Sequence, residues 1–102
     1  ALALASAKRF EPLPAVPTVS EAALPGFEAS VWYAILAPAS VPPDIVTRLN
    51  AATNAYLAGA GKALYTRLGV ETVGGTPGDL KAFIATEQAK WGPVIADAKI
   101  EF

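Results

Sequence analysis

Hydrophobic and polar positions follow two different periods along the 102-residue chain. Short apolar runs, alternating or continuous, favour β-strands at residues 2–6, 28–37 and 70–73. Longer stretches with apolar residues every three or four positions favour α-helices over residues 43–68, in two pieces, and over residues 77–98. With one short helix after the first strand, the expected order is β-α-β-α-α-β-α, and the fold class is α/β.

Hydroxyl and acidic residues at two predicted helix starts match known capping patterns. Thr18 and Glu21 fit a capping box, in which the hydroxyl accepts from one amide and the acid reaches back to another. Thr76 and Asp79 fit a hydroxyl cap with an acid in the first turn. The preceding Gly74-Gly75 could suggest a phosphate cradle, but it lacks the Lys and the glycine spacing of a P-loop. We therefore interpret it as a loop that leads into a capped helix.

Three prolines interrupt residues 8–17, a spacing that neither a helix nor a central strand tolerates. We expect an extended loop there. Lys8 and Arg9 at its start could steer an anionic solute, but two neighbouring charges after a strand are ordinarily solvated.

Composition and charge exclude several classes of function. Hydrophobic residues make up 53% of the chain, enough for one core, and the net charge of −1 gives no reason to expect nucleic acid as a partner. The chain has no His and no Cys, which excludes imidazole and thiolate chemistry. An enzyme would depend on carboxylates such as Glu21, Glu28 and Glu87. Proline loops and a helix cap separate these residues in the sequence, and no pattern brings them to one site. We assign no catalytic residue, cofactor or metal site, although a carboxylate-only site for a hard cation stays open.

The chain also has no Met and starts at Ala1, within an apolar alternating stretch. We expect it to be part of a longer protein. The longest apolar run, residues 31–38, is too short to span a bilayer.

Several short runs resemble, in order and at compatible spacing, the Bug family of TctC-like substrate-binding receptors of tripartite tricarboxylate transporters. The runs are Pro17-Thr18-Val19-Ser20-Glu21, Leu24-Pro25-Gly26-Phe27-Glu28, Trp32-Tyr33, Ala37-Pro38-Ala39, Pro42, Ile45-Val46, Leu49-Asn50, Leu68-Gly69, Gly74-Gly75-Thr76-Pro77, and Glu87 with Trp91. The combination spans nearly the whole chain, although no single run is specific. The departures are Ala34, where Gly is common, and Ala39-Ser40-Val41, which replaces the usual Ala-Gly-Thr.

The resemblance implies the C-terminal part of a periplasmic-binding-protein-like (type II) two-lobed fold, with residues 1–102 as a single portion. Residues 1–7 would then be the crossover or hinge strand, residues 8–17 the Pro-rich loop, and residues 18–102 the strands and helices that complete one lobe. It also implies a periplasmic, non-enzymatic protein. The whole protein would capture a small organic carboxylate and present it to the membrane subunits of the transporter.

Ligand-binding candidates are few, because the family elements that hold the ligand carboxylate would lie outside this portion. Ser30 and Trp32, near the start of the second strand, are the candidates for a pocket. Aromatic residues such as Trp32, Tyr33 and Trp91 are more often core and hinge packing. Glu87 could contact a ligand or a metal, but we favour a structural carboxylate bonded to a backbone amide or an Arg.

Two further expectations concern partners. A competing interpretation is a small α/β protein-interaction module that binds another protein through an exposed apolar helix face. If the chain is part of a receptor, its strands would normally pair with strands outside it. Exposed edges with apolar faces favour association, so we expect the isolated chain to form a homo-oligomer, including by domain swapping.

Overall fold

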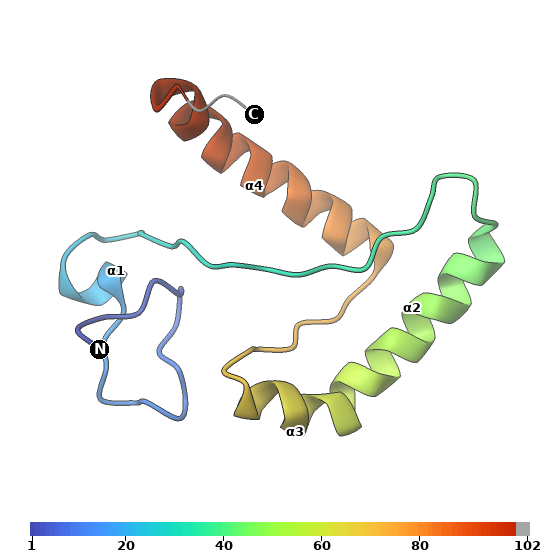
Figure 1. Ribbon diagram of the computed structural model, residues 1–102, viewed down its shortest axis with the longest axis horizontal. Coiled ribbons are helices and arrows are strands. Elements are labelled where there is room, and N and C mark those ends of the chain that lie inside the picture. Colours follow the sequence, from blue (N-terminus) through green and yellow to red (C-terminus); the bar gives the residue numbers. More distant parts are fainter. Residues whose placement is uncertain (100–102) are drawn as a thin grey trace. The chain divides into compact units, whose positions relative to one another are not determined.

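The computed structural model describes residues 1–99, and within them the regular secondary structure consists of four helices (Figure 1). These are α1 (Val19–Ala22), α2 (Pro43–Ala58), α3 (Ala60–Arg67) and α4 (Pro77–Asp97). The chain divides into two compact units, one of residues 1–34 and one that starts at residue 35. Helix α1 lies in the first unit, and the three longer helices lie in the second.

The predicted pair of helices over residues 43–68 is confirmed as α2 and α3. Helix α2 has Pro43 in its first turn, where a missing N–H costs nothing, and Asp44 beside it at the positive end of the helix. Gly59 separates the two helices. Gly69 follows α3 with a φ of 75°, a left-handed conformation that glycine adopts without strain, and this confirms its predicted role as the terminator.

The long C-terminal helix is also confirmed, because α4 begins at Pro77 and ends at Asp97, one residue short of the predicted end. It continues through Pro93, which removes one backbone donor without ending the helix. The predicted first helix is shorter than expected: α1 ends at Ala22, and Leu24 lies beyond it.

The three predicted strands do not form in the part of the chain that the structure describes. Residues 2–6 contribute only an isolated parallel bridge between Leu4 and Thr18. Residues 28–37 run as an extended segment, and residues 70–73 have no regular secondary structure (Figure 1). The physical reason is that a strand needs a neighbour for its backbone groups, whereas a helix bonds within itself. The predicted order of strands and helices is therefore not confirmed.

The predicted hydrophobic core is also absent from the described residues, in which no hydrophobic side chain is buried. Thr18, with 1% of its surface exposed, is the only fully buried side chain among them. Leu49 and Tyr56 of α2 and Phe83 of α4 belong to apolar stripes that remain exposed. The chain therefore has the apolar residues that a core needs, but the described residues do not bury them. None of the helices within residues 1–99 is long and apolar enough to cross a membrane.

Candidate functional site

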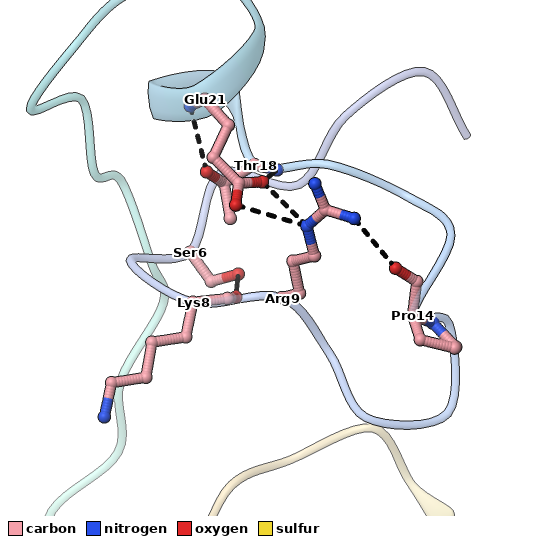
Figure 2. Close-up of polar contacts among 6 residues, drawn as sticks. All are labelled: Ser6, Lys8, Arg9, Pro14, Thr18 and Glu21. Carbon is pink, nitrogen blue, oxygen red and sulfur yellow. Dashed lines mark hydrogen bonds and ion pairs between the residues drawn. The ribbon is translucent and has the colours of Figure 1, made fainter.

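Arg9 connects the Pro-rich loop to the start of α1 (Figure 2). Its Nε–H is shared between the two carboxylate oxygens of Glu21, at 2.9 and 3.2 Å, and its Nη1 donates to the carbonyl of Pro14 at 3.1 Å. Both side chains of the ion pair are about half exposed, at 48% and 47%, so water weakens their attraction. The sequence predicts a solvated Arg9; the structure corrects this, because the guanidinium fastens the loop to the helix cap.

Glu21 is the centre of this cluster, because it also completes the cap of α1. The Thr18 amide donates to Glu21 Oε2 at 2.9 Å, and the Glu21 amide donates to Thr18 Oγ1 at 3.1 Å. The predicted capping box is therefore confirmed. The Thr18 backbone N–H, and then the Arg9 guanidinium, stabilise the charged carboxylate and hold the pKa of Glu21 below its ordinary value of 4.5.

Lys8 takes no part in this cluster (Figure 2). The Ser6 hydroxyl donates to the Lys8 carbonyl at 2.7 Å, which stabilises a bend of the chain at residues 5–8. The Lys8 side chain is exposed and lies away from the Arg9–Glu21 pair. Lys8 therefore fits the solvated charge that the sequence favoured.

A second polar cluster joins α2 to the loop before α4. Asn54 Nδ2 donates to the Gly75 carbonyl at 2.9 Å, and the Gly75 amide donates to Asn54 Oδ1 at 3.0 Å. Asn50 Nδ2 donates to the same carbonyl at 2.9 Å. The loop approaches so closely that a Cβ on Gly74, which has a φ of 69°, would lie 2.8 Å from Asn54 Oδ1. We name this arrangement, formed by Asn50, Asn54 and Gly75, the Asn clamp.

The sequence did not predict the Asn clamp. Asn50 belongs to one of the runs that resemble the Bug family, and Asn54 belongs to none of them. One pattern could have suggested the contact, because Asn50 and Asn54 are four residues apart and therefore lie on the same face of a helix. Nothing local identifies the Gly75 backbone, more than twenty residues further on, as their partner.

The Gly74-Gly75 loop ends in the cap of α4, as predicted. Asp79 Oδ2 accepts from the Thr76 amide at 2.8 Å and from the Thr76 hydroxyl at 2.7 Å, while the Asp79 amide donates to Thr76 Oγ1 at 3.1 Å. The Thr76 backbone N–H and hydroxyl hold the pKa of Asp79 below its ordinary value of 3.8. A carboxylate of the chain itself thus occupies the helix start, which is the place that a phosphate would need.

Glu87 lies in the middle of α4, with 14% of its side chain exposed. Its Oε2 accepts from the indole Nε1–H of Trp91 at 3.0 Å, and Lys90 Nζ lies 3.4 Å from its Oε1. The same ammonium group lies 5.2 Å from the centroid of the Trp91 ring. These two partners come from the same helix and are a Lys and an indole N–H, so the carboxylate is bonded within α4.

The candidates for a solute pocket lie in the extended segment. Ser30 and Trp32 are both exposed, in a stretch without regular secondary structure. Their part in binding stays a prediction. Of the three carboxylates that acid–base chemistry would need, Glu21 is committed to the α1 cap, Glu28 is exposed in the first unit and Glu87 lies in the second. Within residues 1–99, no three acidic side chains are grouped closely enough to hold a metal ion.

Comparison with known proteins places the chain in a class of transport receptors. The family model described as the tripartite tricarboxylate transporter family receptor, TctC, matches residues 1–100. A protein of Pseudomonas sp. named UPF0065 protein in tcbD-tcbE intergenic region is 39% identical over 103 aligned positions, which cover 98% of this chain and 30% of that protein. Protein BugT of Bordetella pertussis is 37% identical over 100 positions, which cover 95% of this chain and 30% of BugT. No solved structure matches the chain.

The chain therefore belongs to the TctC family of tripartite tricarboxylate transporter receptors, also represented by the Bug proteins, which are extracytoplasmic solute-binding receptors. This confirms the resemblance that the sequence runs indicated. The family implies a periplasmic-binding-protein-like fold for the whole receptor. The chain spans only about 30% of the length of these two relatives, so it corresponds to part of a receptor of their size.

Proposed function

We propose that this chain is the C-terminal portion of a periplasmic solute-binding receptor that is not an enzyme. The whole receptor captures a small organic carboxylate between two lobes that close by hinge motion, and it presents the solute to the membrane subunits of a tripartite tricarboxylate transporter. The observation that carries the proposal is the family match, which extends over residues 1–100. Residues 1–7 are proposed as the crossover or hinge segment, and residues 18–102 as elements that complete one lobe.

The contacts within the chain support a structural part in that receptor. The Arg9 guanidinium is engaged by Glu21 and Pro14, and the Asn54 amide is engaged by the Gly75 backbone. Both groups could donate to a carboxylate, but the chain uses them to fasten its own loops. In the proposed receptor, elements outside the chain hold the solute carboxylate, and Ser30 and Trp32 are its neighbours on this side.

Thermal-shift measurements on the full-length receptor that carries these residues test the proposal. A solute that binds only the folded protein stabilises it by about 2.7 kcal/mol at a concentration one hundred times its Kd, which raises the melting temperature. We expect such a shift from at least one member of a panel of di- and tricarboxylates, aromatic acids and amides, and a smaller shift in Ser30→Ala and Trp32→Ala. A folded, ligand-free receptor that responds to no member of the panel would contradict the proposal.

The alternative function is a protein-interaction module. Exposed apolar residues on α2, including Leu49 and Tyr56, favour it, because an exposed apolar helix face is a common protein-binding surface. Under this alternative, the chain binds a protein partner without any solute, and Leu49→Ser weakens that binding. A carboxylate-dependent rise in the melting temperature of the full-length protein is expected only under the receptor proposal.

We also propose that the isolated chain self-associates, because its exposed apolar residues have no cover within the described part. Light scattering at about tens of micromolar, a range that detects weak association, is expected to give a mass above 10.5 kDa. A monodisperse monomer at that concentration would contradict this proposal.

A further inference from the structure

We propose that Gly74 and Gly75 form a pivot for α4, and that the Asn clamp holds this pivot in one setting. While the clamp is closed, α4 has a fixed direction relative to α2. When the clamp opens, the two glycines allow α4 to swing. The inference rests on contacts within residues 50–79 and does not depend on the solute-binding role proposed above.

The amide of Asn54 holds both backbone groups of a single residue. Its Nδ2 donates to the Gly75 carbonyl at 2.9 Å, and its Oδ1 accepts from the Gly75 N–H at 3.0 Å. The N–H belongs to the peptide plane between residues 74 and 75, and the carbonyl belongs to the plane between residues 75 and 76. Because both planes are held, the φ and ψ angles of Gly75, which lie between them, are held as well.

The peptide plane between residues 75 and 76 is also part of the cap of α4. Its carbonyl accepts from Asn50 and Asn54, and its N–H, which is that of Thr76, donates to Asp79 Oδ2 at 2.8 Å. Asp79 lies in the first turn of α4, and the ring of Pro77 fixes the φ angle at the start of the helix. One rigid plane therefore connects α2 to the first turn of α4.

The two glycines supply the freedom that the clamp removes. Gly74 and Gly75 have φ values of 69° and 112°, in a region that other residues rarely adopt. Without the clamp, each glycine can also adopt negative φ values, and a change at either one redirects all 21 residues of α4. Within the described residues, α3 packs on α2, whereas α4 has no comparable packing on either of these helices. The direction of α4 therefore depends on the loop.

The clamp is built so that it can open. The three hydrogen bonds that Asn50 and Asn54 make with Gly75 are accessible to water, which can replace each partner at a modest net cost. Gly74 and Gly75 are themselves exposed, so no buried side chain has to leave its place when the bonds break. Such a local opening requires much less free energy than unfolding of the chain.

Distances between spin labels on α2 and α4 test the inference. The chain has no Cys, so labels attach only to introduced ones, Arg48→Cys in α2 and Gln88→Cys in α4, at two exposed positions outside the clamp. The labelled chain is diluted into unlabelled chain, so that distances between copies do not contribute. We expect Asn54→Ala to make the distribution of α2–α4 distances at least about twofold wider.

Two controls separate this effect from a general loosening of the chain. Thr53→Ala changes the neighbouring polar residue of α2, which takes no part in the clamp, and should leave the α2–α4 distribution unchanged. A second label pair, Arg48→Cys with Lys62→Cys, reports on α2 and α3, which both precede the pivot. Its distances should stay the same in every variant.

Adding Gly75→Ala to Asn54→Ala tests the position of the pivot. Alanine disfavours the positive φ of this position and has much less conformational freedom than glycine. We therefore expect the α2–α4 distribution to narrow again, around a different mean distance from that of the original chain.

Three results would overturn the inference: an unchanged α2–α4 distribution in Asn54→Ala, equal widening in Thr53→Ala, or no narrowing when Gly75→Ala is added. If Asn54→Ala also alters the α2–α3 distances, Asn54→Asp takes its place. This variant keeps the shape of the side chain but replaces the donor with an oxygen that repels the Gly75 carbonyl. It should widen the α2–α4 distribution alone, and an unchanged distribution in this variant would equally overturn the inference.

Discussion

Replacing Asn54 with alanine should release the loop that leads into α4. The Asn54 side-chain amide forms two hydrogen bonds with Gly75: Nδ2 donates to the carbonyl at 2.9 Å, and Oδ1 accepts from the amide at 3.0 Å. Alanine at position 54 keeps a good helix former in α2 and removes both bonds at once, together with the 3.3 Å bond from Asn54 Nδ2 to Asn50 Oδ1. The loop then keeps only the bond that Asn50 donates to the Gly75 carbonyl.

The magnitude follows from the two bonds. A neutral hydrogen bond contributes about 1 kcal/mol net, and both of these bonds are accessible to water, so we expect a loss of about 1–2 kcal/mol in the local opening free energy. That loss corresponds to roughly 5–30-fold faster exchange of the Gly75 amide. Amide hydrogen exchange resolved by NMR measures this directly, because the Gly75 N–H is itself a member of the Asn clamp.

Two variants make the test sharper. Asn50→Ala removes one bond to the Gly75 carbonyl and the 3.3 Å bond that Asn50 Oδ1 accepts from Asn54 Nδ2, but it leaves both bonds between Asn54 and Gly75 in place. Because Gly75 loses only one bond, we expect less than about 5-fold faster exchange. Gly74→Ala should act like Asn54→Ala, because its Cβ would meet Asn54 Oδ1 and its φ of 69° disfavours a side chain. If exchange of the Gly75 amide were unchanged in Asn54→Ala, or equally fast in Asn50→Ala, the clamp would not hold this loop.

The remaining predictions concern the caps and the Glu87 pair. Thr76→Ala should lower α4 stability by about 1 kcal/mol, and Thr76→Ser should restore most of it; helicity by circular dichroism against temperature measures both, and equal melting of the two variants would contradict the cap. The folded-state pKa of Glu21 is lowered, so its stabilisation is complete above its ordinary pKa of 4.5 and is lost as the pH falls through the lowered value. Arg9→Gln should raise the pKa of Glu21 in an NMR titration, and an unchanged pKa would exclude the guanidinium as a cause. Glu87→Ala should shift the Trp91 indole N–H resonance, while Glu87→Gln keeps an oxygen acceptor and should shift it less; similar shifts in the two variants would argue against the bond.

Local features of the fold were predictable because their causes are local. Thr18 with Glu21, and Thr76 with Asp79, form capping boxes within four residues of sequence. A helix also satisfies its backbone within itself, so apolar periodicity and caps are enough to locate α2, α3 and α4 to within one or two residues.

The candidate site was harder to predict, because its contacts join distant positions. Arg9 and Glu21 are twelve residues apart, and neither the charge pattern nor the prolines between them indicate that they meet. The Asn54 contact with Gly75 spans twenty-one residues. Its partner is a backbone group, which no pattern of side chains in the sequence identifies. For Glu87, the sequence indicated a carboxylate that needs partners, but it did not identify Trp91 as one of them.

The sequence alone determined the helices, their caps and the family of the chain, because each of these depends on residue types at short, fixed spacings. Tertiary structure decided the rest. The apolar residues 31–37 predict a strand and a core, yet the described residues contain neither, since both depend on backbone and side-chain partners that local sequence cannot supply. Which residues meet across the loops, such as Arg9 with Glu21, likewise became visible only in three dimensions.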